Sequence, residues 1–120
     1  MAIDPRGADL KRYLQEDPGG PVVMLNLLRF AEGGRETYEK YSSAVRETFL
    51  PRYGGEVVYA GDGATPLVAE DGQDWDAVML IRYPSRQAFS KMVADPEYQQ
   101  FTHFRSQALT EAVLQPTRQR

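Results

Sequence analysis

The sequence of 120 residues contains no cysteine and only one histidine, His103. The missing cysteines exclude disulfide bonds, thiolate metal sites and cysteine nucleophiles. One histidine without cysteine cannot supply the usual zinc ligands. The sequence also lacks the glycine-rich dinucleotide fingerprint and the serine nucleophile elbow. We therefore expect no metal and no cofactor.

Long apolar runs and an excess of basic charge are also missing. No run approaches the roughly 20 apolar residues that a membrane helix needs, and the N-terminus lacks a signal-peptide pattern. Lysine and arginine number 14 against 17 acidic residues, and the basic residues are scattered. This distribution argues against a nucleic-acid partner. We expect a cytoplasmic protein that binds neither membrane nor nucleic acid.

The length fits a single domain over residues 1–120, with a helical extension over residues 1–20 and a frayed tail at 118–120. Two segments, 21–30 and 75–83, are apolar on both faces when their side chains alternate as in a strand. Turn and cap residues outline the remaining elements: a helix at 36–52, a strand at 56–60, a strand or hairpin arm at 65–70, a helix after Ser85, a helix from Asp95-Pro96 to Ala112, and an edge strand at 113–117.

This β-α-β-β-α-β order predicts a ferredoxin-like α+β fold with a four-stranded antiparallel sheet. Its two crossover helices cover one face of the sheet and leave the other bare. An uncovered apolar face would exceed the few hundred Å² of apolar patch that monomers usually expose. We therefore predict a homodimer that closes the open sheet face. The alternative is that the N-terminal helix folds over that face.

Several segments resemble one family. They are MLNLLRF at 24–30, Tyr41, Trp75-Asp76, and RYPSRQAFSKMVADPEYQ at 82–99. Together they resemble the family called domain of unknown function 1330, over roughly residues 21–114. The resemblance implies a dimeric α/β barrel. Its wider superfamily includes cofactor-independent monooxygenases, haem-degrading enzymes, chlorite dismutase-like proteins and plain ligand binders, while the closer family has no agreed activity.

Asn26 is the main candidate for a ligand-binding residue, because it stands at a strand position where an apolar residue is expected. A buried amide without a partner costs about 1–3 kcal/mol, so a ligand, a water or a core neighbour must bond it. Tyr41 lies on a helix stripe that faces the sheet and would pair with Asn26 if its hydroxyl points there. Trp75 either packs in the core or walls a site for a flat ligand.

Arg82 and Arg29, near strand ends, could each clamp a carboxylate; the alternative is an ion pair with an acidic neighbour. His103 falls on the polar face of its helix, which indicates exposure unless that face lines a cleft. Haem-degrading members of the superfamily use an asparagine, a tryptophan and a histidine, the types of Asn26, Trp75 and His103. His103 lies on a later helix than this resemblance implies, so the sequence departs from that haem site at the histidine.

Two functions remain open at this point. The first is a pocket near Asn26 for a small apolar or carboxylate-bearing molecule, between helices and sheet or inside the dimer barrel, lined by Asn26, Tyr41, Trp75 and Arg82. If the protein is an enzyme, cofactor-independent oxygenation or isomerisation suits the scarcity of acid–base groups. The second is a non-catalytic dimeric binding or assembly module in which Asn26 is a structural tie.

Overall fold

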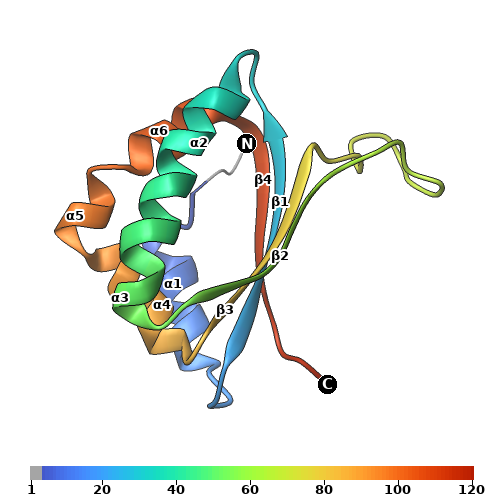
Figure 1. Ribbon diagram of the computed structural model, residues 1–120. Coiled ribbons are helices and arrows are strands. Elements are labelled where there is room, and N and C mark those ends of the chain that lie inside the picture. The colour runs from blue at the N-terminus through green and yellow to red at the C-terminus, as the bar shows by residue number, and fades with distance from the viewer. Residues whose placement is uncertain (1–3) are drawn as a thin grey trace.

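A four-stranded antiparallel sheet forms the centre of the protein, with its helices gathered on one side (Figure 1). The computed structural model describes residues 4–120. The strands lie in the order β2-β3-β1-β4, which is the predicted ferredoxin-like arrangement. Their bounds are Val22–Phe30 for β1, Glu56–Asp62 for β2, Ala77–Tyr83 for β3 and Leu109–Thr117 for β4.

The helices follow the predicted caps and breaks. Their bounds are Gly7–Gln15 for α1, Gly34–Ala44 for α2, Val45–Phe49 for the π-helical turn η1, Leu50–Tyr53 for α3, Arg86–Ala94 for α4, Pro96–Gln99 for α5 and Thr102–Ala108 for α6. The Ser85 hydroxyl accepts the backbone N–H of Ala88 at 3.0 Å, and the Asp95 carboxylate accepts that of Glu97 at 2.9 Å. Both caps were expected from the sequence. No helix within residues 4–120 is long and apolar enough to cross a membrane.

Three local predictions were wrong. The last helix ends at Ala108 rather than Ala112, because β4 pairs with β1 from Leu109 onward. Asp4 before Pro5 predicts a cap for the first helix, but the N-cap position of α1 is held by Arg6. Residues 65–70 form no strand. Of the extension predicted over residues 1–20, residues 1–3 lie outside the described part of the chain.

The helix-covered face of the sheet holds the core. Val22, Met24 and Leu28 of β1 are buried there against the helices. Helix α1 joins this side, since the Tyr13 and Phe89 rings pack edge to face with centroids 5.8 Å apart. The N-terminal helix therefore extends the helical layer, and the alternative that it covers the open face is wrong.

The opposite face, which we call the open face, carries the other set of strand residues. Cross-strand pairs share a face, so Leu25 and Leu80 lie together there, as do Leu27 and Val113. All four are partly exposed. No helix of residues 4–120 lies over this face (Figure 1). The folded chain therefore has an apolar sheet face that its own helices do not cover.

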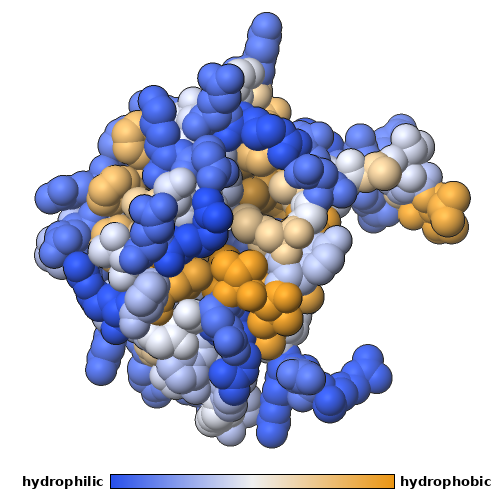
Figure 2. All heavy atoms as spheres, viewed as in Figure 1, coloured by the Kyte–Doolittle hydropathy of each residue, from blue (hydrophilic) through white to orange (hydrophobic). Residues whose placement is uncertain are grey.

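The loop between β2 and β3, residues 63–76, projects on the open side of the sheet, and we call it the arm (Figure 1). At its root the two backbones approach closely: a Cβ on Gly63 would lie 1.8 Å from the Trp75 carbonyl oxygen. Only glycine fits such an approach. Leu67 and Val68 on the arm are fully exposed, and apolar atoms gather at its end (Figure 2).

Candidate functional site

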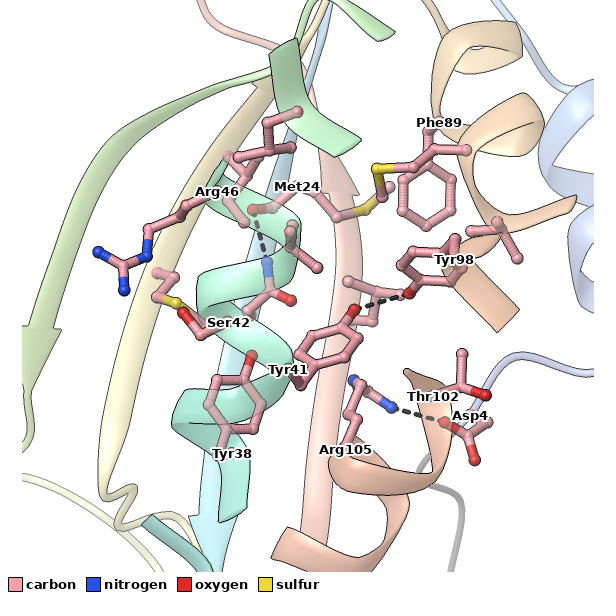
Figure 3. Close-up of a pocket in the computed structure, with 18 of the residues that line it drawn as sticks. Asp4, Met24, Tyr38, Tyr41, Ser42, Arg46, Phe89, Tyr98, Thr102 and Arg105 are labelled. Atoms are coloured by element: carbon pink, nitrogen blue, oxygen red, sulfur yellow. Dashed lines mark hydrogen bonds and ion pairs between the residues drawn. The ribbon is translucent and has the colours of Figure 1, made fainter. Parts of the chain in front are cut away.

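A cavity of about 310 Å³ lies between the helical layer and the covered face of the sheet. Ligand cavities in proteins usually begin near this volume and are mainly apolar with a few convergent polar groups. This cavity has both properties (Figure 3). Its apolar walls come from the sheet, from α2 with η1 and α3, and from α4, including Met24, Val45, Leu50, Met79, Ile81, Phe89, Met92 and Leu114.

Asn26 borders the cavity from the middle of β1. Strand alternation places it on the covered face between Met24 and Leu28, and it is 8% exposed. Its amide nitrogen donates to the Met24 carbonyl oxygen at 3.2 Å. A side-chain amide has two N–H donors and one carbonyl acceptor, so this bond engages one donor. Asn26 is therefore a buried polar group with a backbone tie at the cavity wall.

Tyr41 of α2 and Tyr98 of α5 meet in the cavity with their hydroxyl oxygens 2.6 Å apart (Figure 3). The Tyr41 hydroxyl thus bonds Tyr98 rather than Asn26. Burial raises the pKa of Tyr41 well above its ordinary value and also raises the pKa of Tyr98. Burial likewise raises the pKa of the neighbouring Tyr38 to about 12. At neutral pH these hydroxyls are uncharged hydrogen-bonding groups, not bases.

Arg105 of α6 adds a positive charge at one end of the cavity (Figure 3). It is only 6% exposed, and its guanidinium nitrogen lies 2.7 Å from a carboxylate oxygen of Asp4. The second Asp4 oxygen accepts the Ser106 hydroxyl at 3.0 Å. Sequence reasoning missed this residue. The available signal was an arginine on the apolar stripe of its helix, with Tyr98, Phe101 and Ala108, where charges are rarely buried unpaired.

Few groups of the cavity can exchange protons. Among the described residues of its wall, Asp4 is the one carboxylate and there is no histidine or lysine. Within residues 4–120, no three histidine, aspartate or glutamate side chains converge as a metal site would require. Two arginines border the cavity: Arg105 is buried, whereas Arg46 is half-exposed and pairs with Glu39 at 2.6 Å. The site therefore offers hydrogen bonds and one buried cation rather than an array of acids and bases.

The other predicted site residues lie elsewhere. Arg82 is on the open face, 3.7 Å from Glu56 of the neighbouring strand. Trp75 lies at the root of the arm, with the Arg29 guanidinium 4.8 Å from its ring. His103 is exposed on α6, its ring 4.0 Å from that of Phe104. The structure thus brings Asn26 and Tyr41 to one cavity and leaves these three outside it.

This placement also bears on the haem hypothesis. Asn26 faces the cavity, Trp75 lies at the root of the arm, and His103 points to solvent. The three residue types that suggested haem therefore do not converge on one site. The described chain does not provide the ligand set that the hypothesis needs.

Comparisons with known proteins place the chain in a family. No curated protein matches it. A protein of unknown function from Rhodopseudomonas palustris is 30% identical, with 96% of this chain and 94% of that chain covered and a TM-score of 0.87.

Two more distant structures share the fold alone. A dimeric protein of unknown function with a ferredoxin-like fold from Bacteroides fragilis is 10% identical, with 81% of this chain and 94% of that chain covered and a TM-score of 0.55. A dabb family protein with a ferredoxin-like fold from Mesorhizobium loti is 8% identical, with 84% and 98% covered and a TM-score of 0.62. A family model described as a domain of unknown function, DUF1330, matches residues 30–115. The chain therefore belongs to the DUF1330 family.

Proposed function

We propose that the protein binds a small, mainly apolar molecule in the cavity between its helices and its sheet. The observation that carries this proposal is the composition of the wall: apolar side chains interrupted by Asn26, the Tyr41–Tyr98 pair and Arg105. Burying a polar group costs free energy unless it is bonded. Each of these four groups has a partner within the chain, but packing alone would need only apolar residues. Four buried polar groups around one cavity are therefore better explained by a ligand that uses them.

Binding is the function that this geometry supports best, ahead of catalysis. The scarcity of acid–base groups in the sequence suggested isomerisation or cofactor-independent oxygenation, but these reactions still need a base that takes a proton from the substrate. The buried tyrosines keep their protons at neutral pH, since burial raises the pKa of Tyr41 and Tyr98. Asp4 is the remaining candidate base in the described wall, and it is engaged by Arg105. An enzymatic reaction here would have to run through Asp4.

A binding screen with a blocked cavity tests the proposal. Ala60 is exposed and borders the cavity from β2, so Ala60→Trp would place an indole at its edge without disturbing the core. Val58 lies on the same strand, is 54% exposed and does not border the cavity. Val58→Trp is therefore the matched control.

We expect some members of a panel of flat apolar acids, phenols and neutral amides to raise the melting temperature of the wild type and of Val58→Trp. The same molecules should have little effect on Ala60→Trp, because their site is filled. A panel that shifts none of the three proteins, or shifts all three equally, would contradict a ligand in this cavity.

We further propose that the protein is a homodimer whose subunits meet through the open face. The support is the uncovered apolar surface around Leu25, Leu27 and Leu80, because stable soluble monomers rarely expose such a patch. A second copy related by a two-fold axis would bring the same surface to cover it. A protein of the same fold from Bacteroides fragilis is described as dimeric.

The arm supports the same partner. Its root is fixed, because Arg29 on the open face donates to the Gly72 carbonyl oxygen at 2.9 Å and lies over the Trp75 ring. Its exposed residues Leu67 and Val68 are apolar, and the arm extends on the side where the second copy would stand (Figure 1). A fixed root with an apolar, uncovered end is suited to grip a partner subunit rather than to remain in solvent.

A further inference from the structure

We infer that Arg105 recognises a carboxylate of the ligand, and that Asp4 is an internal substitute which the ligand's carboxylate displaces. This inference rests on the proposed function, because it names the chemical class that the same cavity would take. It makes the N-terminal segment a competitor for the site. The ligand would be an aromatic or aliphatic carboxylic acid.

Burial and geometry single out Arg105. A charge that leaves water costs several kcal/mol unless an opposite charge and hydrogen bonds compensate it. The guanidinium is rigid, planar and permanently charged, which suits it to bind a carboxylate through paired N–H donors. Its charge also reaches the cavity, where it lowers the pKa of Tyr41 and Tyr38 against the larger raising effect of burial. The buried, permanently charged Arg105 therefore favours an anion at this end of the cavity.

The two partners of this ion pair are buried very unequally. The Arg105 side chain is 7% exposed, whereas the Asp4 side chain is 52% exposed. Asp4 precedes α1 in a segment without helix or strand, and its carboxylate is held by Arg105 and Ser106. The half-exposed Asp4 carboxylate has ready access to water if it leaves, whereas the buried Arg105 guanidinium has little. Exchange of Asp4 for a ligand carboxylate preserves the buried charge pair and costs little on the Asp4 side.

The rest of the wall defines the remainder of the ligand. Beyond Arg105 the cavity continues past the Tyr41–Tyr98 pair to apolar side chains such as Phe89 and Met24 (Figure 3). Methionine and aromatic side chains pack well against flat rings. A molecule with a carboxylate at one end and a ring system at the other matches this order of groups.

Calorimetric titration with 2-naphthoate and its neutral counterpart 2-naphthamide tests the inference. Asp4→Asn removes the competing charge while keeping the side-chain shape. Asp62→Asn is the matched control, since Asp62 is an exposed aspartate that pairs with Arg35 at 2.8 Å and does not border the cavity. We expect Asp4→Asn to tighten naphthoate binding about tenfold and to leave naphthamide binding unchanged, because an internal competitor is lost. Asp62→Asn should change neither.

Variants of Arg105 give the complementary result. Arg105→Met should remove the preference for the acid over the amide, and Arg105→Lys should weaken naphthoate binding several-fold because the paired donors are lost. Circular dichroism shows whether each variant folds. If Arg105→Met does not fold, Arg105→Lys in the Asp4→Asn background decides.

The outcomes separate the two proposals. If both probes bind but Asp4→Asn leaves naphthoate affinity unchanged or lowers it, the cavity binds ligands and the displacement of Asp4 is wrong. Equal affinity of Arg105→Met and the wild type for the acid would equally overturn the role of Arg105. If neither probe binds the wild type or Asp4→Asn, and the wider panel also fails, the proposed function and this inference fall together.

Discussion

The two faces of the sheet are made by the same strands and yet differ in chemistry. The covered face places Asn26 beside a cavity that also holds buried tyrosines and Arg105. The open face carries leucine and valine at its centre, with ion pairs such as Arg29–Glu111 and Arg82–Glu56 toward its ends. A face with buried polar groups is equipped for a ligand. A face with an apolar centre and a charged margin resembles a protein interface.

Successive side chains of strand β1 point to opposite faces of the sheet, so this strand contributes to both surfaces. Met24, Asn26 and Leu28 point to the helices, while Leu25 and Leu27 point to the open side. A register shift of one residue would exchange the two sets and destroy both surfaces. The comparison between faces can therefore be tested with neighbouring residues of one strand.

The largest expected effect comes from truncating Leu28. This side chain is fully buried, so Leu28→Ala should lower the free energy of unfolding by about 2–5 kcal/mol through lost burial and a new cavity. Its neighbour Leu27 is partly exposed, so Leu27→Ala should cost a single subunit less. Urea unfolding at several protein concentrations distinguishes lost stability of the single subunit from lost dimerisation. The deficit of Leu28→Ala should not depend on concentration, whereas that of Leu27→Ala should grow with it through lost dimerisation.

A charge on the open face sharpens the contrast. Leu27→Asp should raise the dimer dissociation constant at least about 100-fold, because two carboxylates would be buried at the symmetric interface. Circular dichroism should remain that of a folded subunit. Thr48→Asp, on the exposed side of the helical layer, is the control that should leave association unchanged. Sedimentation of the wild type as a monomer at micromolar concentration would contradict the proposed interface.

Local signals account for most of what the sequence predicted about the fold. The caps Ser85 and Asp95 act within three residues of their own positions, and strand alternation assigned Asn26 and Leu27 to opposite faces. The boundary at Ala108 was missed because pairing of β4 with β1 overrides the helical pattern of that segment. Long-range pairing of this kind leaves no local trace in a single sequence.

The site was harder to predict, for the same reason. Arg105 pairs with Asp4, which is 101 positions away in the chain, so no short sequence motif predicts this ion pair. Trp75 could not be placed because its neighbour Arg29 holds it at the root of the arm, outside the strand that was expected to carry it. Periodicity placed Asn26 on one face with Met24 and Leu28, and Tyr41 on the helix stripe that faces the sheet. It fixes the face of an element but not the partner of a side chain, so the sequence left open on which side of the sheet a pocket would lie.

The tyrosines of the covered face provide a pH test. Burial raises the pKa of Tyr38 to about 12 and raises those of Tyr41, Tyr83 and Tyr98. Unfolded tyrosine titrates near pH 10. Above that pH the unfolded chain releases protons that the folded chain retains, so stability is complete below about pH 10 and falls as pH rises toward 12. Each buried tyrosine adds at most about 1.4 kcal/mol per pH unit to this slope.

Denaturant unfolding between pH 8 and pH 11.5, followed together with tyrosinate absorbance, measures this dependence. Tyr41→Phe should reduce the slope, because one retained proton is lost from the folded state. The difference in tyrosinate absorbance between the folded wild type and folded Tyr41→Phe reports the ionisation of Tyr41. Ionisation near pH 10 in the folded protein would contradict the prediction, because it would mean that water reaches the Tyr41 hydroxyl.

The arm is expected to give the smallest effect and the most specific one. Leu67 and Val68 touch little of their own subunit, being fully exposed, so Leu67→Ser with Val68→Ser should leave the stability of a single subunit unchanged. If the arm grips the second copy, the same change should raise the dimer dissociation constant about tenfold through lost apolar contact. Glu70→Ser with Asp71→Ser, on the same arm and also exposed, controls for altered loop chemistry. Equal dissociation constants for both double variants would separate the arm from the interface, and the open face alone would then have to hold the two subunits together.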